Sequence, residues 1–218
     1  MDLLAHIDNY CERTDPSLWS EPLNAASNLA FLIAAAALWR RAHGKSMQTE
    51  LRTLASLIAA IGICSGLFHV VGTVWGMLLD VGSIALFILV YIHRYLRHLV
   101  RWPLWACWLG VLLFIAGDRA IAALGPLGLN GSEGYLLPGA TLAAFAIHSR
   151  QLVPDAARWL GAATLVFAWS LGLRTLDMAL CASWPAGTHF AWHVLNALVL
   201  YCCVRALALV LGMRQVKY

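Results

Sequence analysis

The sequence predicts an all-α integral membrane protein, a bundle of seven helices that forms a single domain over residues 1–218. Hydrophobic residues make up 61% of the chain and charged residues only 12%, whereas soluble domains are about 45–50% apolar and about 25% charged. Apolar runs long enough for membrane helices recur along the chain, with short connections between them. Basic residues are concentrated in every second connection between these runs, as expected when alternate connections lie on the cytoplasmic side of a membrane.

Seven apolar segments account for the predicted helices. They cover residues 24–39, 54–71, 74–92, 103–117, 135–148, 159–173 and 189–213. A helix that crosses a bilayer needs about 20 residues, with a range of roughly 17–25. The second, third and seventh segments meet this length, whereas the fourth, fifth and sixth need flanking residues to span. Residues 1–22 form a short acidic N-terminal arm before the first helix, and we expect no cleavable signal peptide there.

The distribution of lysine and arginine predicts the orientation. The loops after the first, third and fifth segments and the tail after the seventh hold Arg40, Arg41, Lys45, Arg52, Arg94, Arg97, Arg101, Arg150, Arg158, Arg214 and Lys217. The opposite side holds only Arg13, Arg119 and Arg174. Because cytoplasmic loops are enriched in these residues, we expect the N-terminus outside and the C-terminus in the cytoplasm. The net charge of +4 then reflects orientation, and we expect no nucleic-acid partner.

Two histidines, His189 and His193, stand four residues apart at the outer start of the seventh segment. Residues at this spacing share one face of a helix, and neutral imidazoles can bind zinc at about 2.0–2.1 Å. A catalytic zinc site takes three protein ligands and leaves a position for water. His69, at the outer end of the second segment, is the natural third ligand. The alternative is that each histidine is a hydrogen-bonded packing residue, and we assign this role to His6, His43, His93, His98 and His148.

Asp80 and Ser65 are the other polar residues at this predicted depth. Asp80 lies eleven residues after His69 in an otherwise apolar helix, where a carboxylate is costly and faces the bundle interior. We favour Asp80 as the general base for a zinc-activated water; the alternative is a carboxylate that orients a zinc-ligating histidine. Ser65 lies one helical turn before His69 and can bond a substrate carbonyl or oxyanion. Its alternative role is that of a small residue that permits close helix packing.

The N-terminal arm contains a cluster of oxygen-bearing side chains, namely Asp8, Asn9, Glu12, Asp15 and Glu21. Oxygen ligands suit calcium, but the EF-hand spacing is absent, and a solvated acidic segment is the alternative. Cys11 in the arm and Cys181 after the sixth segment share the predicted outer side, where a disulfide can form. Arg174 and Asp177, at i and i+3 near the end of the sixth segment, are expected to pair with each other.

Three stretches together resemble the alkaline ceramidases, a family of seven-helix intramembrane amidases. The stretch YCERTDPSLWSEPLNAASNLAF is similar to the family's Cys-Glu segment, which is followed by Glu, Asn and Ser-Asn at the entry to the first helix. GICSGLFHVVGTVWGMLLD matches a Ser-x-x-x-His motif with an Asp eleven residues further on, and HFAWH matches the His-x-x-x-His of the last helix. The resemblance covers most of the chain by architecture and is specific at these three places.

The resemblance implies a zinc ion bound by His69, His189 and His193, with Ser65 and Asp80 serving catalysis. It also implies a calcium site, onto which Glu12 and Glu21 map. The family's acidic residue two positions before the cysteine is Asn9 in this chain, and Asp8 stands one residue earlier. The stretch from Glu12 to Glu21 is shorter than in the family. Finally, Cys11 and Cys181 match positions that a disulfide joins in the family.

The implied activity is zinc-dependent hydrolysis of the amide bond of ceramide or a similar N-acyl lipid to a free fatty acid and a sphingoid-type amine. The substrate would then be a membrane lipid. Two alternatives stand beside this activity. One is a seven-helix, zinc-containing receptor-type protein with little or no hydrolase activity, and the other is a structural metal site in a transporter-like bundle.

Overall fold

The computed structural model describes residues 2–42 and 47–213. Its helices, in chain order, are α1 (Pro22–Ser27), α2 (Leu29–Ala42), α3 (Gln48–Val71), α4 (Val74–Tyr95), η1 (Leu96–Val100, a π-helical turn), α5 (Leu104–Ala122), η2 (Glu133–Tyr135, a 3-10 turn), α6 (Leu136–Ser149), α7 (Pro154–Leu180) and α8 (His189–Met213). Four residues used above, namely Lys45, Arg214, Lys217 and His43, lie outside the described residues. Within the described ranges, the only extended pairing is an isolated bridge between His6 and Thr73.

The predicted apolar segments correspond to helices, but their bounds differ from the expectation. Segment 24–39 is divided between α1 and α2, and segments 103–117 and 135–148 begin one residue before α5 and α6. In the described residues, six helices are long and apolar enough to cross a membrane, with α1 and α2 counted as one. The sixth segment becomes the middle of α7, which has 27 residues. Segment 135–148, in contrast, forms α6 with only 14 residues, which is shorter than a spanning helix needs.

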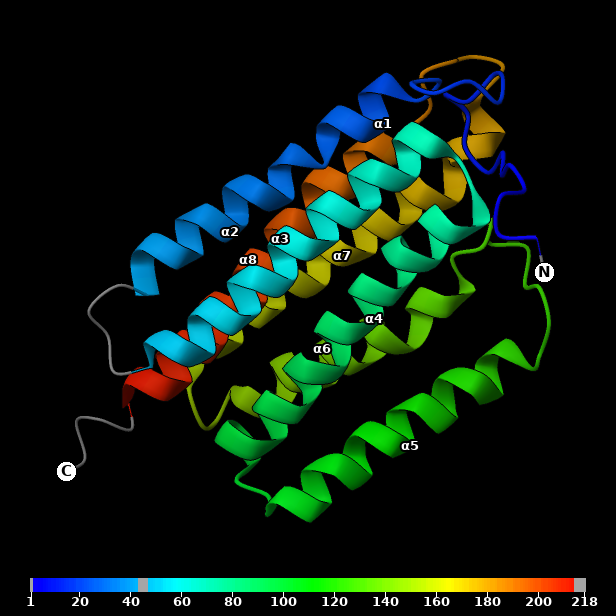
Figure 1. The fold of residues 1–218 in the computed structure, drawn as a ribbon. Helices are drawn as coiled ribbons and strands as arrows, with labels where there is room; N and C mark the ends of the chain where they lie inside the picture. The colour runs from blue at the N-terminus through cyan, green and yellow to red at the C-terminus, as the bar shows by residue number, and fades with distance from the viewer. Residues whose placement is uncertain (1, 43–46, 214–218) are drawn as a thin grey trace.

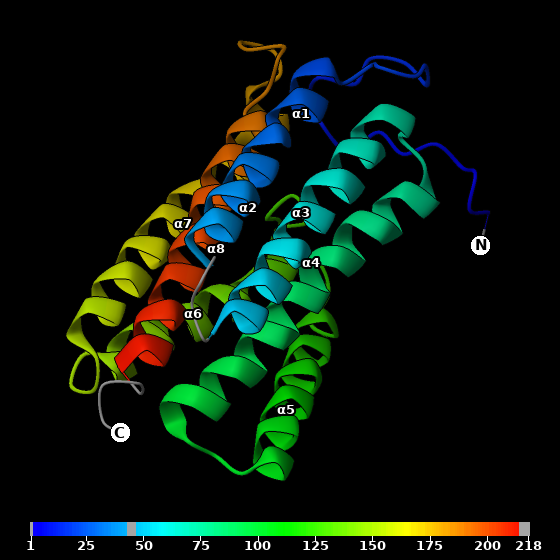
Figure 2. The same ribbon diagram turned by 60° about the vertical axis from the view of Figure 1, so that its left-hand side comes forward.

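The long helices run side by side in one bundle, and α8 packs against α2, α3 and α7 (Figure 1). Helix α5 lies at the edge of this bundle in every view (Figure 2). Its buried residues are Cys107 and Val111, while large apolar side chains such as Trp105 and Leu113 are exposed. A helix that exposes several large apolar side chains suits contact with lipid better than contact with water.

Two glycines of α3 allow the close approaches on which the bundle depends. A Cβ atom at Gly62 would lie 2.9 Å from Cβ of Phe31 and 3.1 Å from the Asn28 carbonyl oxygen, so this glycine lets α2 and α3 pack tightly. Gly72 ends α3 in the left-handed conformation, with φ of 58°, which favours glycine. A side chain there would also collide with the Arg13 guanidinium.

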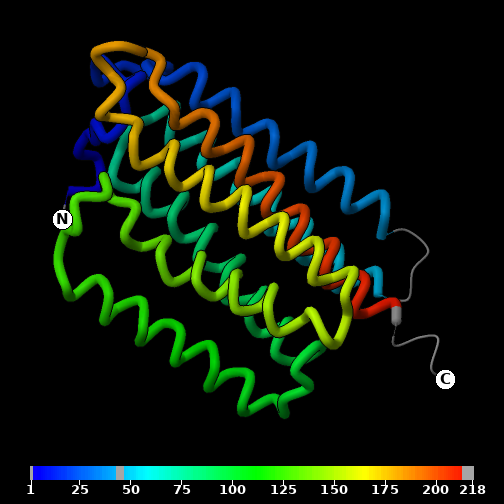
Figure 3. Tube along the Cα trace, turned by 180° about the vertical axis from the view of Figure 1, so that it is seen from behind, coloured from blue at the N-terminus to red at the C-terminus, as the bar shows by residue number. Residues whose placement is uncertain are grey.

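One end of the bundle, here called the arm end, gathers the N-terminal arm and the α3–α4, α5–α6 and α7–α8 connections (Figure 3). A disulfide joins Cys11 in the arm to Cys181 just after α7, with Cα atoms 5.3 Å apart. The Asp177 carboxylate accepts hydrogen bonds from the backbone N–H groups of Cys11, Thr188 and His189. The arm is therefore fixed to the end of α7 by both a covalent and a polar connection, and Asp177 also bonds the start of α8.

We expect thiol labelling to report this disulfide directly. In denatured but unreduced protein, an alkylating reagent should modify Cys64, Cys107, Cys202 and Cys203, and Cys11 and Cys181 should react only after reduction. Reduction should also lower the free energy of unfolding by about 2–4 kcal/mol. Mass spectrometry of tryptic peptides checks the pattern, and the Cys11→Ser variant is the control, because it should make Cys181 reactive before reduction. Labelling of Cys11 in unreduced wild-type protein would contradict the pairing.

Candidate metal centre

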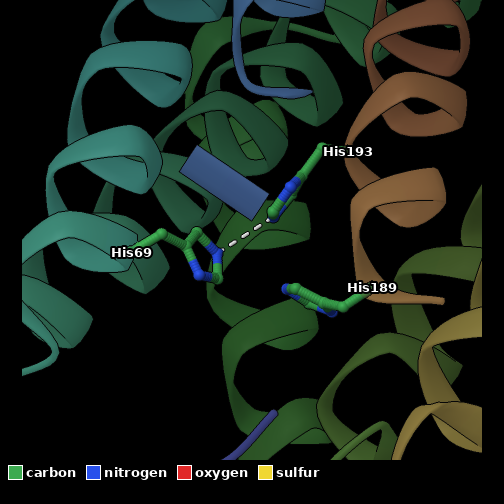
Figure 4. Close-up of side chains that lie close together, drawn as sticks. All are labelled: His69, His189 and His193. Carbon is green, nitrogen blue, oxygen red and sulfur yellow. Dashed lines mark hydrogen bonds between the residues drawn. The ribbon is translucent and has the colours of Figure 1, made fainter. Parts of the chain in front are cut away.

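Three imidazole rings converge at the arm end of the bundle. His69 comes from the last turn of α3, and His189 and His193 come from the first two turns of α8. Their rings point toward one another (Figure 4), and one ligand nitrogen from each lies within 4.8 Å of the other two. The exposed fractions are 0%, 2% and 2%. In the part of the chain that the structure describes, no other trio of potential ligand side chains comes this close.

Hydrogen bonds orient two of these rings with a lone pair toward the centre. Glu21 Oε2 lies 2.6 Å from Nδ1 of His69, and because a carboxylate only accepts, Nδ1 carries the proton. Ser27 Oγ donates to the Asn24 carbonyl at 2.7 Å and therefore accepts from Nδ1 of His193 at 2.7 Å. In the neutral rings, Nε2 of His69 and Nε2 of His193 then both present lone pairs.

The two Nε2 atoms face each other at 3.1 Å. Two lone pairs repel at this distance, so either a proton or a metal cation must lie between them. A tetrahedral zinc site places neighbouring nitrogens about 3.3 Å apart, close to the observed separation. The third ring supports a metal over a shared proton, because a proton bridges two atoms whereas a metal ion accepts three or more ligands.

His189 is held by its neighbours on both sides. The Tyr10 ring stacks on its imidazole with centroids 3.7 Å apart, and its backbone N–H donates to Asp177 Oδ1 at 2.9 Å. A carboxylate at the first turn of α8 also interacts favourably with the helix dipole. His189 Nδ1 is buried without a hydrogen-bond partner among the described residues. Asp177 thus positions His189, and the expected Arg174–Asp177 pair is absent because the Asp177 oxygens bond backbone N–H groups instead.

Glu21, 1% exposed, connects the three-histidine group to the N-terminal arm. Its Oε1 accepts from Arg13 Nε at 2.6 Å, and its Oε2 accepts from Asn24 Nδ2 at 3.0 Å as well as from His69. Burial opposes the charged form of Glu21, but these three donors outweigh burial and lower its pKa. Arg13 also donates to the carbonyl oxygens of Asp15, Ser17 and His69. Sequence reasoning missed Arg13, although it is the one basic residue of the acidic arm.

The residues expected to bind calcium do not come together. Glu12 accepts from the backbone N–H groups of Leu23 and Asn24 at 2.6 and 2.8 Å and so serves the first turn of α1. Asp8 is exposed, and Glu21 bonds Arg13 and His69. The cation beside Glu21 is thus the Arg13 guanidinium, and the arrangement does not fit a calcium ion. We therefore derive no role for calcium.

Asp80 and Ser65 lie next to the three-histidine group. Ser65 is buried one turn before His69 on α3, and Asp80 is buried on the second turn of α4. The Asp80 carboxylate interacts with the Ser65 hydroxyl and lies close enough to His69 and to the Arg174 guanidinium to interact with them electrostatically. Its Oδ1 is buried without a hydrogen-bond partner among the described residues. An acceptor of this kind fits a water molecule held by a neighbouring metal ion.

An apolar cavity of about 100 Å³ opens from this group into the bundle between α3, α4, α6 and α8. Ser65, Tyr135 and His193 line it at the arm end, and Tyr91 and Cys203 line it further in. Ten residues of α8 separate His193 from Cys203, a distance of roughly 15 Å along the helix. The cavity therefore joins the candidate metal centre to a long hydrophobic space.

Comparison with known proteins adds no relative, because no family model, no curated protein and no solved structure matches this chain.

We expect the purified protein to retain about one transition-metal ion per chain, measured by inductively coupled plasma mass spectrometry. His193→Ala should lose most of this ion, because two histidines bind far more weakly than three. His6→Ala is the control, because His6 is exposed in the N-terminal arm and should leave the metal content unchanged. Equal metal content in His193→Ala and wild type would exclude this centre.

Asp177→Asn should weaken metal binding by about 10- to 100-fold, because the amide cannot accept all three backbone N–H groups and His189 loses its anchor. Titration of the metal-free protein against a competing chelator measures the change. Asp155→Asn serves as the control, since the Asp155 side chain is 70% exposed in the first turn of α7. An unchanged affinity in Asp177→Asn would show that this carboxylate does not position the ligand.

Proposed function

We propose that this chain is a multi-pass membrane hydrolase that uses zinc to cleave the amide bond of ceramide or a similar N-acyl lipid, releasing a fatty acid and a sphingoid-type amine. One observation carries the proposal: three converging imidazoles and a buried carboxylate, Asp80, lie beside an apolar cavity that His193 and Ser65 line. The resemblance of its motifs to those of the alkaline ceramidases agrees with this chemistry.

For the membrane topology, we propose seven spans, with the short α6 extended by its flanking residues as the seventh. Arginines flank three of the connections. Arg40, Arg41 and Arg52 lie in the helix ends on either side of the α2–α3 connection, Arg94, Arg97 and Arg101 lie at the α4–α5 connection, and Arg150 and Arg158 lie at the α6–α7 connection. We propose that these connections face the cytoplasm. The arm end, with its disulfide, then faces the other side, where disulfides persist. The candidate site would lie near that side of the membrane, with its cavity leading toward the bilayer centre.

His69, His189 and His193 would hold the zinc ion. When bound, zinc supplies a water of lowered pKa and polarises a carbonyl group. The three ligands leave room for that water and the substrate. Nδ1 of His69 bonds Glu21 and Nδ1 of His193 bonds Ser27, so Asp80 orients neither ring. This supports the role of base for Asp80 over the role of an orienting carboxylate.

In the proposed reaction, the cavity binds the acyl chain and brings its amide carbonyl to the site. Asp80 accepts a proton from the attacking water, whose oxygen bonds to the carbonyl carbon. The Ser65 hydroxyl donates a hydrogen bond to the carbonyl oxygen as negative charge develops there. The carbon–nitrogen bond then breaks, and Asp80 returns the proton to the leaving amine. The products are a carboxylic acid and an amine, and they account for all atoms of the water and the lipid.

The direct test is incubation of purified protein with a panel of N-acyl lipids, with and without a zinc chelator, while free fatty acid is measured by mass spectrometry. We expect release from at least one lipid and its loss on chelation, with recovery after zinc is added back. His193→Ala should lose both zinc and release. No release from any N-acyl lipid by zinc-loaded protein would favour the receptor-type alternative.

Asp80→Asn should retain zinc but lower the turnover number by about 100-fold or more, because general bases contribute roughly 10²–10⁴ to rate. Zinc content and initial rates measured on the same preparation separate the two effects. Asp118→Asn, at the end of α5 and paired with the adjacent Arg119, is the matched control. A wild-type rate in Asp80→Asn would remove Asp80 from the chemistry.

A further inference from the structure

Arg174 is a cation without an ionic partner beside the candidate centre. Its Nη1 donates to the Asn130 carbonyl oxygen at 2.9 Å and to Ser132 Oγ at 2.8 Å, both of which are neutral acceptors. Asp177, the carboxylate nearest in sequence, bonds backbone N–H groups instead. Among the described residues, no carboxylate oxygen lies within 4.0 Å of the Arg174 guanidinium.

Ring contacts place the guanidinium beside two aromatic residues of the cavity wall. Its central carbon lies 5.2 Å from the centroid of the Tyr135 ring and 5.8 Å from that of Trp192. Both rings line the cavity together with Ser65 and His193. On the other side, Arg174 interacts with Tyr10, whose ring stacks on His189. The charge therefore lies next to the three-histidine group.

The aromatic neighbours do not neutralise this charge. Tyr10 and Tyr135 carry phenols and Trp192 carries an indole, which are all uncharged at physiological pH. Cation–π contacts with these rings stabilise the guanidinium but leave its charge in place. Two carboxylates, Asp80 and Glu133, interact with this charge electrostatically but form no ion pair with the guanidinium within 4.0 Å. A partly buried guanidinium whose hydrogen-bond acceptors are all neutral fits a site that receives an anion, and its fork matches a carboxylate or a phosphate.

We infer that Arg174 forms a subsite for an anionic group, a carboxylate or a phosphate, on the amine half of the substrate. This inference rests on the proposed hydrolase function. The acyl chain occupies the apolar cavity, the amide carbonyl lies at the three-histidine group, and the amine half extends toward Arg174, Tyr10 and the Asn130–Ser132 turn. The preferred substrates are then N-acyl amino acids or N-acylated phosphate esters, in preference to uncharged N-acyl lipids.

Arg174 also has a structural contribution, because it fastens the turn at residues 130–132 to α7. Loss of that contact alone would change the hydrolysis of every lipid by a similar factor. A subsite for an anion instead changes the ratio between charged and uncharged substrates. The ratio therefore separates the two roles even if a variant is less stable.

The experiment uses three lipids with the same acyl chain, namely N-acylglycine, N-acylethanolamine and N-acylethanolamine phosphate. We expect the zinc-loaded wild type to have a higher kcat/KM for at least one anionic lipid than for N-acylethanolamine. Arg174→Gln should reduce the ratio of that value to the value for N-acylethanolamine by about 10- to 100-fold. Arg174→Lys should retain part of the preference. Arg119→Gln, with a side chain that is 75% exposed, is the control and should leave the ratio unchanged.

The glycine and phosphate lipids identify which anion the subsite takes. A wild type that prefers N-acylethanolamine, or an Arg174→Gln variant that slows all three lipids equally, overturns the inference while the hydrolase function stands. If the wild type cleaves neither these three lipids nor any other lipid of the N-acyl lipid panel, the proposed function fails. Calorimetry of the same three lipids then tests the anionic subsite separately from hydrolysis. Tighter binding of the anionic lipids than of N-acylethanolamine, lost in Arg174→Gln, supports the subsite. Equal binding of all three lipids by the wild type overturns it.

Discussion

The buried carboxylate of Glu21 is the contact on which the arm end of the molecule depends. One oxygen bonds the Arg13 guanidinium and the other bonds the His69 imidazole, both at 2.6 Å. Burial of a carboxylate costs several kcal/mol unless partners satisfy it, so neither partner is dispensable. By holding both, Glu21 fixes the tautomer of His69 and docks the N-terminal arm against the end of α3. Gly72 leaves the space in which the guanidinium lies.

Segments far apart in sequence meet around this contact. The arm contributes Tyr10 as the surface under His189, α1 contributes Ser27 as the acceptor for His193, and α7 contributes Asp177 as the acceptor at the start of α8. The disulfide between Cys11 and Cys181 holds the arm over this assembly. Glu21 orients His69, Ser27 orients His193, and Tyr10 and Asp177 hold His189. The apolar cavity begins beside His193. This is the preorganisation that metal-dependent chemistry on a lipid requires.

The sequence was sufficient to predict an all-helical apolar chain and the convergence of the three histidines, because both follow from local spacing and from the distribution of basic residues. It did not predict the helix lengths, since segment 135–148 forms a helix of only 14 residues. His69 and the His189–His193 pair lie at one depth whenever helices alternate in direction, without further tertiary information. The partners of these histidines were not predictable in the same way. Asp177 lies one turn from Arg174, so local spacing favours a salt bridge, yet Asp177 bonds backbone groups that folding brings to it from the arm and α8. Likewise, the acidic arm predicts that a cation lies nearby, but it does not distinguish calcium from a basic side chain. The cation beside Glu21 is the Arg13 guanidinium.

The central feature of the site is the convergence of three imidazoles on one metal ion. X-ray absorption spectroscopy at the zinc edge of the purified, zinc-loaded protein measures the ligands of that ion. We expect three imidazole nitrogens at about 2.0–2.1 Å, with the remaining coordination from oxygen. Sulfur ligands at about 2.3 Å, or a spectrum without the imidazole signature, would contradict this expectation.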